Sequence, residues 1–191
     1  MRVKRLLLLL FPLVLLVALP GVVAHANVAI AFCDTGRSLC ANRSGGGTGT
    51  GTHVIAYNKD KDNNEDFEAS GVQYCNAQGT VTATCPLVPA SLNTPFIGSP
   101  TVTIYSYGTN KCIGDGGSGF AALEACGDIT GHNGGTGTIF IQTPSNFFVN
   151  REWTDKGGQN EYLYDNGYRN QLVLNKPQPV NQQGQWTSYF G

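Results

Sequence analysis

Short segments rich in β-branched and aromatic residues recur along this chain, separated by clusters of glycine, asparagine, aspartate and proline. Segments of this length and composition are typical of β-strands, and the clusters between them are typical of turns. The strand-like segments are Val54–Tyr57, Val81–Thr84, Val102–Tyr105, Thr138–Ile141, Phe147–Val149, Tyr162–Tyr164 and Leu172–Leu174. Beyond the N-terminus, no stretch keeps a 3.6-residue apolar period for three turns. The pattern predicts an all-β sandwich or barrel.

Residues 1–26 have the organisation of a secretory signal peptide. Three basic residues precede an apolar run from Leu6 to about Val23, which ends at the small-x-small pattern Ala24–Ala26. The alternative is an uncleaved membrane anchor, because the apolar run is nearly long enough to span a bilayer. Pro12, Pro20 and the small-residue exit favour cleavage after Ala26. We therefore expect a secreted, extracellular protein in which residues 27–191 form a single domain with no membrane insertion.

The charge of the mature chain excludes two classes of partner. Removal of the signal peptide leaves nine of the 12 basic residues to face 13 acidic residues. A nucleic-acid surface requires clustered lysine and arginine, which this balance does not provide. Electrostatic docking on anionic lipid is disfavoured for the same reason.

Six cysteines follow the signal peptide, and an even number in an exported chain indicates disulfides. They are Cys33, Cys40, Cys75, Cys85, Cys112 and Cys126. Six cysteines allow 15 pairings in principle. We expect sequential pairs, because the second and third pairs each bracket a glycine-containing turn that would bring them face to face. Zinc ligation would need CxxC-type spacing, which is absent.

An internal repeat narrows the choice between sandwich and barrel. Asn42-Arg43 is followed by two glycines and then by Tyr57, fifteen residues after Asn42. Asn150-Arg151 is followed by Gly157-Gly158 and then by Tyr164, fourteen residues after Asn150. A weaker copy extends from Cys112 to Cys126. Three units of about 55 residues each could not bury their own apolar faces, so the copies must pack together.

With these repeats, the chain resembles the ricin-type β-trefoil lectins. Each repeat of that family runs from a Leu-Cys-x-Asp-like start, through a glycine-rich turn and an apolar strand, to a Gln-x-Trp-like closing motif. In the first repeat these parts match Leu39–Asn42, Val54–Tyr57 and Asn64–Phe67; in the third they match Phe148–Asn150, Tyr162–Tyr164 and Gln185-Trp186. Cys112 and Cys126 fit the intra-repeat disulfide of the second. The resemblance implies an all-β, disulfide-stapled β-trefoil of three pseudo-repeats.

The resemblance also implies a carbohydrate site in the first and third repeats. The family places an acid, an aromatic and an amide in one repeat, so that an aromatic ring faces the sugar and polar groups bind its hydroxyls. Carried over by position, the site residues are Asn42, Tyr57, Asn64 and Glu65 in the first repeat, and Asn150 and Tyr164 in the third. The alternative is that the tyrosines pack in the core and the asparagines stabilise turns.

Motifs for catalysis or metal binding are weak. Only His53 and His132 follow the signal peptide, and neither belongs to a recognisable nucleophile or metal motif. Asp60, Asp62 and Asn64 match half of a calcium loop, but Glu65 replaces its required glycine. We therefore expect a monomeric protein that is not an enzyme and has no cofactor or metal.

Three function classes follow from this reading. The first is non-catalytic carbohydrate binding, with a carbohydrate or glycoconjugate as partner. The second is an inhibitor or toxin-like trefoil that binds an exported protein, for which the loop from Pro86 to Pro100 is the best feature. The third is a structural cell-surface protein without a sugar site, since no repeat carries an intact Gln-x-Trp.

Overall fold

The computed structural model describes residues 30–60, 63–70, 95–117, 119–126, 137–150, 160–176 and 183–190. Twelve β-strands, two short 3₁₀ turns and no α-helix occur within these ranges. The expected signal peptide, the Cys75–Cys85 pair and most of the Pro86–Pro100 loop lie outside the described residues. No helix in the described ranges is long and apolar enough to span a membrane.

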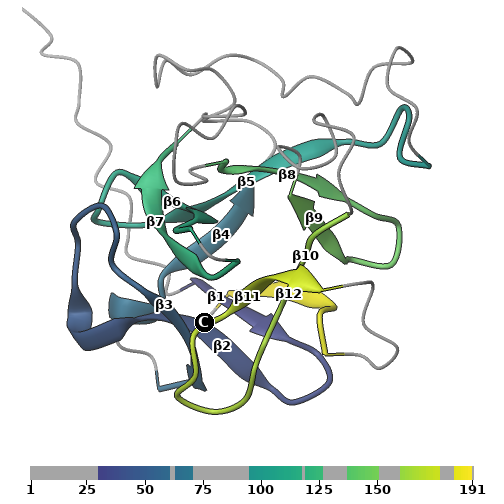
Figure 1. Cartoon of the computed structure of the whole chain (residues 1–191). Helices are drawn as coiled ribbons and strands as arrows, with labels where there is room; N and C mark the ends of the chain where they lie inside the picture. The colour runs from purple at the N-terminus through teal and green to yellow at the C-terminus, as the bar shows by residue number, and fades with distance from the viewer. Residues whose placement is uncertain are drawn as a thin grey trace, which may run out of the picture.

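The strands form three consecutive units of four (Figure 1). The first unit contains β1 (Ile30–Asp34), β2 (Leu39–Arg43), β3 (Val54–Asn58) and β4 (Phe67–Ser70), with the 3₁₀ turns η1 (Ser44–Gly46) and η2 (Asn63–Glu65). The second contains β5 (Thr101–Ser106), β6 (Lys111–Asp115), β7 (Ala121–Ala125) and β8 (Ile139–Gln142). The third contains β9 (Phe148–Asn150), β10 (Tyr162–Tyr164), β11 (Val173–Lys176) and β12 (Trp186–Phe190).

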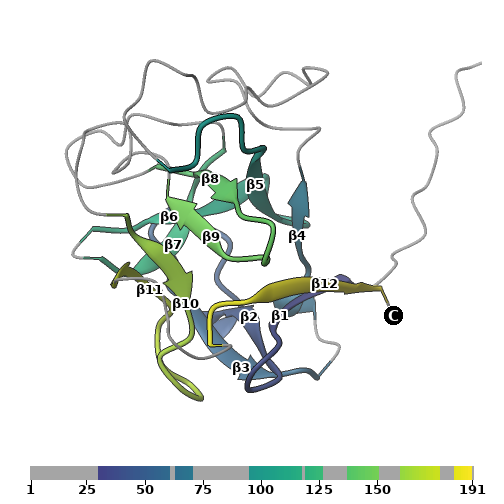
Figure 2. The same ribbon diagram turned by 90° about the vertical axis from the view of Figure 1, so that its right-hand side faces the viewer.

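The first and last strands of the units form a closed barrel. Antiparallel ladders join β12 to β1, β4 to β5, β5 to β8 and β8 to β9. The bridge between Ala31 and Asp66 connects β1 to the start of β4, and the bridge between Phe147 and Gln185 connects the last two barrel strands. Figure 2 shows β12 lying next to β1 on its way to the C-terminus. Closure of the ring leaves none of these six strands as a free edge.

The middle strands of each unit form a hairpin, and the three hairpins are locked to one another by equivalent backbone hydrogen bonds. The amide of Ala56 donates to the carbonyl of Asn170 (2.9 Å), and that of Leu123 donates to Thr52 (2.8 Å). The amide of Leu174 completes the cycle by donating to Gly119 (2.9 Å). A six-stranded barrel with three hairpins in this cyclic arrangement is a β-trefoil, which confirms the predicted fold class.

One continuous apolar core fills the space between the barrel and the hairpins. Phe32 stacks on Trp186 with ring centroids 5.1 Å apart and meets the edge of Phe148 at 5.2 Å. The indole Nε1 of Trp186 donates to the carbonyl of Leu163 at 3.0 Å, so this buried ring leaves its polar atom satisfied. Strands from the first and third units therefore share one core.

The barrel confirms the closing positions of the first and third repeats. The carbonyl of Asp66 accepts from the amide of Tyr107, and that of Gln185 accepts from Thr35, both at 2.8 Å. The first and third units therefore each close by bonding to the turn after the first strand of the next unit around the barrel, as expected for a cyclic repeat. Phe67 and Trp186, the residues that follow, occupy equivalent positions.

The predicted opening of the third repeat at Phe148–Asn150 is wrong. Tyr162 pairs with Val149 as Cys40 pairs with Cys33, so β10 is equivalent to β2 and not to β3. Asn150 therefore lies at the end of a barrel strand and has no equivalence to Asn42, whose counterpart is Tyr164. The error arose because residues 151–161, between β9 and β10, span about as many positions as the β2–β3 turn of the first unit.

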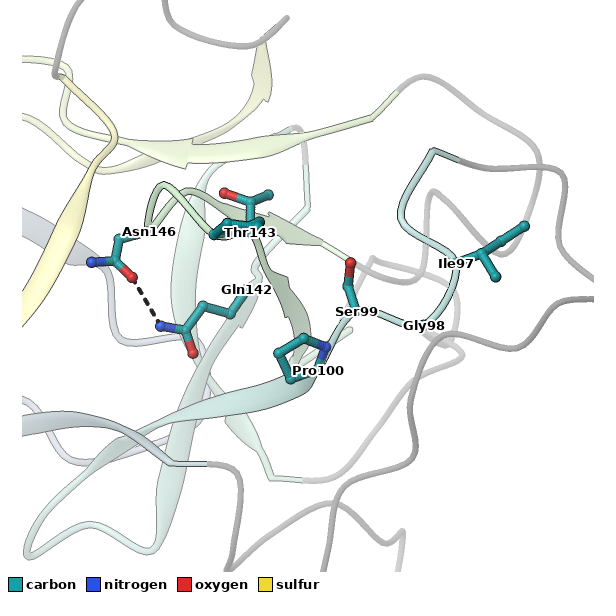
Figure 3. Close-up of a pocket in the computed structure, with 8 residues that line it drawn as sticks. Ile97, Gly98, Ser99, Pro100, Gln142, Thr143 and Asn146 are labelled. Carbon is teal, nitrogen blue, oxygen red and sulfur yellow. Dashed lines mark hydrogen bonds between the residues drawn. The ribbon is translucent and has the colours of Figure 1, made fainter.

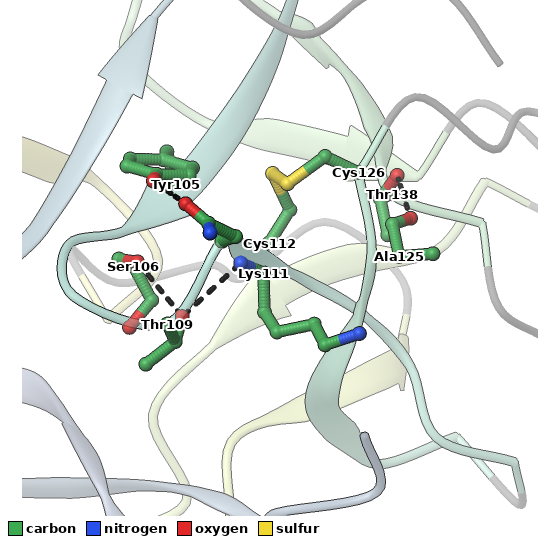
Figure 4. Close-up of a disulfide and its surroundings, with 9 residues drawn as sticks. Tyr105, Ser106, Thr109, Lys111, Cys112, Ala125, Cys126 and Thr138 are labelled. Atoms are coloured by element: carbon green, nitrogen blue, oxygen red, sulfur yellow. Dashed lines mark hydrogen bonds between the residues drawn. A yellow bond between two sulfur atoms is a disulfide. The ribbon is translucent and has the colours of Figure 1, made fainter. Parts of the chain in front are cut away.

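Two of the three expected disulfides lie in the described part of the chain, and both are confirmed. Cys33 bonds to Cys40 across the β1–β2 pair, and Cys112 bonds to Cys126 beside β6 and β7. Figure 4 shows the second bond next to Tyr105, whose hydroxyl donates to the Asn110 side chain at 3.0 Å.

We expect the disulfides to stabilise the domain according to the loops they close. The Cys112–Cys126 pair is separated by 14 residues, for which the chain-entropy model gives a stabilisation of about 3 kcal/mol. The Cys33–Cys40 pair is separated by 7 residues, for which the model gives about 2.5 kcal/mol. Urea unfolding of the double variants Cys112→Ala/Cys126→Ala and Cys33→Ala/Cys40→Ala should show losses in this order. An unchanged unfolding midpoint in either double variant would contradict the expectation.

Candidate functional site

The predicted site residues of the first repeat do not all lie together. Tyr57 is half-exposed on β3 and pairs with Cys40, and Asn42 is buried on the same face of the hairpin. Asn64 lies beside Gly46, beyond the far end of β2. Glu65 is buried, and its Oε1 accepts from the backbone amide of Asp60 at 2.7 Å. Of the four, Tyr57 presents the most accessible ring or polar group at the hairpin surface.

The predicted residues of the third repeat lie on two different strands and are at least partly buried. Asn150 is fully buried, and its Nδ2 donates to the carbonyl of Gly137 at 2.9 Å. Tyr164 is half-buried at the end of β10, where burial raises the pKa of its hydroxyl. Their positions on two different strands follow from the corrected register of this unit.

An exposed aromatic cluster forms where the β2–β3 hairpin meets the turn between β10 and β11. The rings of Tyr57 and Tyr168 lie 5.1 Å apart, and Tyr168 is 44% exposed. The guanidinium carbon of Arg169 lies 5.6 Å from the centroid of Tyr57 and 5.1 Å from that of Tyr168. Arg169 Nη2 also donates to the Tyr57 hydroxyl at 3.3 Å. We call these three residues the Tyr57 cluster.

Hydrogen bonding couples the polar atoms of the Tyr57 cluster. Hydrogen bonds from Tyr168 and then Arg169 lower the pKa of the Tyr57 hydroxyl. The same bond to Tyr57 raises the pKa of Tyr168. The cluster therefore combines two ring faces with a set of oriented donors and acceptors, which is the combination that a sugar ring requires.

Local turn chemistry holds Tyr168 and Arg169 in place. The carboxylate of Asp165 accepts from the amide of Gly167 at 2.9 Å, which is an Asx turn. The amide of Asn170 donates to the carbonyl of Gly167 at 3.0 Å. The amide of Arg169 donates to the carbonyl of Ala56 at 2.7 Å, so the turn is anchored to β3 next to Tyr57.

Arg169 adopts a backbone conformation that arginine rarely adopts. Its φ is 63°, in the left-handed region that costs a side chain-bearing residue about 1 kcal/mol. Gly51 occupies the equivalent position of the first hairpin: its φ is 80°, and its amide donates to Leu123 as that of Arg169 donates to Ala56. The first unit therefore has glycine at this position, whereas the third unit has arginine at a cost in conformational free energy. This difference makes the Arg169 side chain a candidate functional group.

Two buried carboxylates, Asp34 and Asp165, stabilise the β1–β2 and β10–β11 turns respectively. Asp34 and Asp165 are 0% and 1% exposed, and Arg37 Nη1 bonds to Asp165 Oδ1 at 2.7 Å. The Oδ1 of Asp34 accepts from the amides of Gly36 and Arg37. In the described structure the Oδ2 atoms of both aspartates have no hydrogen-bond partner. Burial, and then repulsion from Asp165, raise the pKa of Asp34 to about 6 against these opposing amides.

A hollow of about 440 Å³ lies away from the Tyr57 cluster, between the segment that precedes β5 and the turn that follows β8 (Figure 3). Ile97, Pro100, Gln142 and Asn146 are among its lining residues, and Gln142 Nε2 donates to Asn146 Oδ1 at 3.2 Å. Its described lining residues include neither an aromatic ring nor a titratable side chain. These residues therefore supply no ring face for a sugar and no acid or base for catalysis. In the described ranges, no three His, Cys, Asp or Glu side chains form a group able to hold a metal.

Sequence reasoning found Tyr57 but missed Tyr168 and Arg169. They lie outside every repeat motif, in a turn that the Asp165-Asn166-Gly167 sequence does indicate. An aromatic residue followed by arginine within such a turn is a usable signal for an exposed site. Its proximity to Tyr57, 111 positions earlier, depends on the packing of the first hairpin against the third.

We expect Asp34 to make stability pH-dependent. Because its pKa is raised from 3.8 to about 6 on folding, the folded protein binds this proton more tightly. The contribution is complete below about pH 4 and is lost as the pH rises to about 6. Asp34→Asn should remove this decline of stability between about pH 4 and pH 6. Above about pH 6, the variant should have a free energy of unfolding about 1 kcal/mol higher than that of the wild type. Urea titrations across the window test this, and parallel pH curves for both proteins would contradict it.

Comparison with known proteins supports the fold but assigns no family or function. No protein-family model matches the chain, and no curated protein matches its sequence. Among solved structures, the chain is similar to a designed threefold-symmetric protein, ThreeFoil, with a TM-score of 0.50 and 9% sequence identity. The match covers 83% of this chain and 96% of the designed one. At this identity the likeness shows a shared architecture: this chain has a threefold, trefoil-like fold.

Proposed function

We propose that this protein is a secreted, non-catalytic carbohydrate-binding module whose binding surface is the Tyr57 cluster. The tyrosine faces would pack against the C–H face of a sugar ring, and the guanidinium and hydroxyl groups would bind its hydroxyls. Asn166 and Asn170 are exposed in the same turn and add amide groups at the rim. Disulfides in the domain are compatible with an extracellular location.

The observation that carries this proposal is the strained backbone of Arg169. A turn that needed only its shape would favour glycine, as the first hairpin has at Gly51. Retention of arginine places a cation against two tyrosine rings, one of them 44% exposed. Strain retained for the sake of an exposed side chain is common at ligand sites.

The proposal assigns no catalytic step to the site. Glycoside hydrolysis uses two carboxyl groups that reach the scissile bond. Asp165 begins the turn that carries Arg169, Asp34 interacts with it electrostatically, and both carboxyl groups are buried. Their contacts with backbone amides and Arg37 give them a structural role in the β1–β2 and β10–β11 turns.

Glycan-array and calorimetric binding with Tyr168→Ala and Arg169→Gly test the site. Each change should weaken glycan binding by about tenfold or more, because each removes a ring face or a donor. Arg169→Gly should change the free energy of unfolding by less than about 1 kcal/mol, since relief of strain offsets the added chain entropy. Tyr107→Ala, which removes a 37%-exposed tyrosine of the second unit, is the matched control. Loss of binding in the control alone would place the site elsewhere, and no glycan binding at all would remove the proposal.

Protein binding is the second candidate, and the exposure of Ile97 favours it. This side chain is 49% exposed at the rim of the 440 Å³ hollow, beside Pro100. An exposed apolar side chain next to a hollow is typical of a contact with another protein. An exported hydrolase that loses activity on binding the wild type, but retains it with Ile97→Asp, would support inhibition. Equal inhibition by both proteins would exclude this hollow as the inhibitory surface.

A further inference from the structure

Two cations of the described structure rest on tyrosine rings without an ion-pair partner there. Arg169 lies over Tyr57 and Tyr168, and the Nζ of Lys59 lies 5.0 Å from the centroid of Tyr189. The ion pair between Arg37 and Asp165 involves neither cation. Both positive charges are therefore available to an external anion, and both are placed beside a face that a sugar ring could cover.

The strand register places these two pairs on the same face of one sheet. Cys40 lies directly opposite both Cys33 and Tyr57, and Ala31 lies opposite Tyr189. Directly paired residues project to the same side of a sheet, as do residues two positions apart on one strand. Tyr57, the disulfide and Tyr189 therefore share one side of the sheet β12-β1-β2-β3.

That side is the outer face of the sheet. The alternate residues Phe32, Ala41 and Trp186 belong to the main core, whereas Ala31, Cys33 and Cys40 form a separate small cluster. Tyr189 is 43% exposed on this outer face. The face therefore has an accessible ring at each side of the disulfide.

A hollow lies on this face beside the Lys59–Tyr189 pair. It has a volume of about 260 Å³ and is lined by Cys33, Ser38, Cys40, Lys59 and Tyr189. Cys40 is the strand partner of Tyr57, so the next strand position beyond this lining belongs to the Tyr57 cluster. From β3 to β12 the sheet spans three strand spacings, about 14 Å. This span suits an oligosaccharide lying across the strands better than a single sugar.

We propose that the outer face binds an anionic oligosaccharide, with Arg169 and Lys59 as two separate subsites for its carboxylate or sulfate groups. This inference rests on the proposed carbohydrate-binding function and names the ligand class for the same site. The guanidinium of Arg169 can bind a planar carboxylate or a sulfate through two parallel hydrogen bonds. Lys59 supplies a point charge at the far end of the hollow.

The negative charge of Asp60 opposes the binding of an anionic ligand. Removing this charge should therefore strengthen binding, whereas removing Arg169 or Lys59 should weaken it. The Asp60 charge acts on Tyr57 and counteracts the effect of Arg169 on the pKa of that hydroxyl. A carboxylate beside the site repels an anionic ligand. Asp60→Asn should therefore tighten binding of the charged glycan by about two- to threefold at low salt, as expected for an exposed charge pair.

The experiment uses pairs of probes in which one member carries anionic groups and the other is uncharged. Polygalacturonate is compared with its methyl ester, and dextran sulfate with dextran, by calorimetry at low and at physiological salt. We expect the wild type to bind the charged member of at least one pair about tenfold more tightly than the uncharged member. The pair that shows this difference identifies whether the recognised group is a carboxylate or a sulfate. Arg169→Gln and Lys59→Gln should each weaken binding of the charged glycan more than binding of the uncharged glycan, and so remove most of this preference. Arg169→Lys, which keeps both the charge and the backbone strain, should retain part of it.

Three outcomes would overturn the inference. Equal affinity for both members of both pairs would show that charge is not recognised, and the carbohydrate-binding proposal would stand without it. Equal weakening of charged and uncharged glycans by Arg169→Gln would assign Arg169 to hydroxyl groups instead. Absence of binding to any of these glycans, together with an empty glycan array, would remove both proposals. Unfolding curves of each variant separate loss of the site from loss of the fold.

Discussion

The cycle of backbone hydrogen bonds among the three hairpins is the constraint on which the rest of this structure depends. Each hairpin donates from one strand amide to the turn of another, through Ala56, Leu123 and Leu174. These bonds satisfy backbone groups that would otherwise be buried without partners. They also determine which turn lies beside which strand. The Tyr57 cluster exists because the third hairpin's turn is bonded to β3 of the first.

The same pseudo-symmetry identifies where the units have diverged. Gly51 and Arg169 occupy equivalent turn positions with positive φ, yet only one carries a side chain. A conformational cost of about 1 kcal/mol is a noticeable part of the stability of a small domain. Comparison between the units therefore identifies Arg169 as a candidate functional position without any comparison between proteins. The buried pair of Asp34 and Asp165 is a second departure, since it crosses from the first unit to the third.

The predictions from sequence succeeded where the relevant forces are local. Short strands, glycine-rich turns and the Cys33–Cys40 and Cys112–Cys126 bonds all depend on residues close in the chain. The third repeat was misaligned because a long β9–β10 connection has the same length as the β2–β3 turn of the first unit. Spacing alone cannot distinguish two loops of similar length that follow different strands. For this reason Asn150 was placed in a site although it is buried and bonded to Gly137.

The sequence by itself determined the all-β class, the threefold repeat and two of the covalent links, because alternating strand and turn chemistry acts over a few residues. It also identified Tyr57 as a candidate. Only the tertiary structure decided what Tyr57 faces. Tyr168 and Arg169 meet it through hairpin packing, and barrel pairing places Tyr189 on the same sheet face, where Tyr189 meets Lys59. Such neighbours are brought together by contacts between distant parts of the chain, which no local pattern encodes.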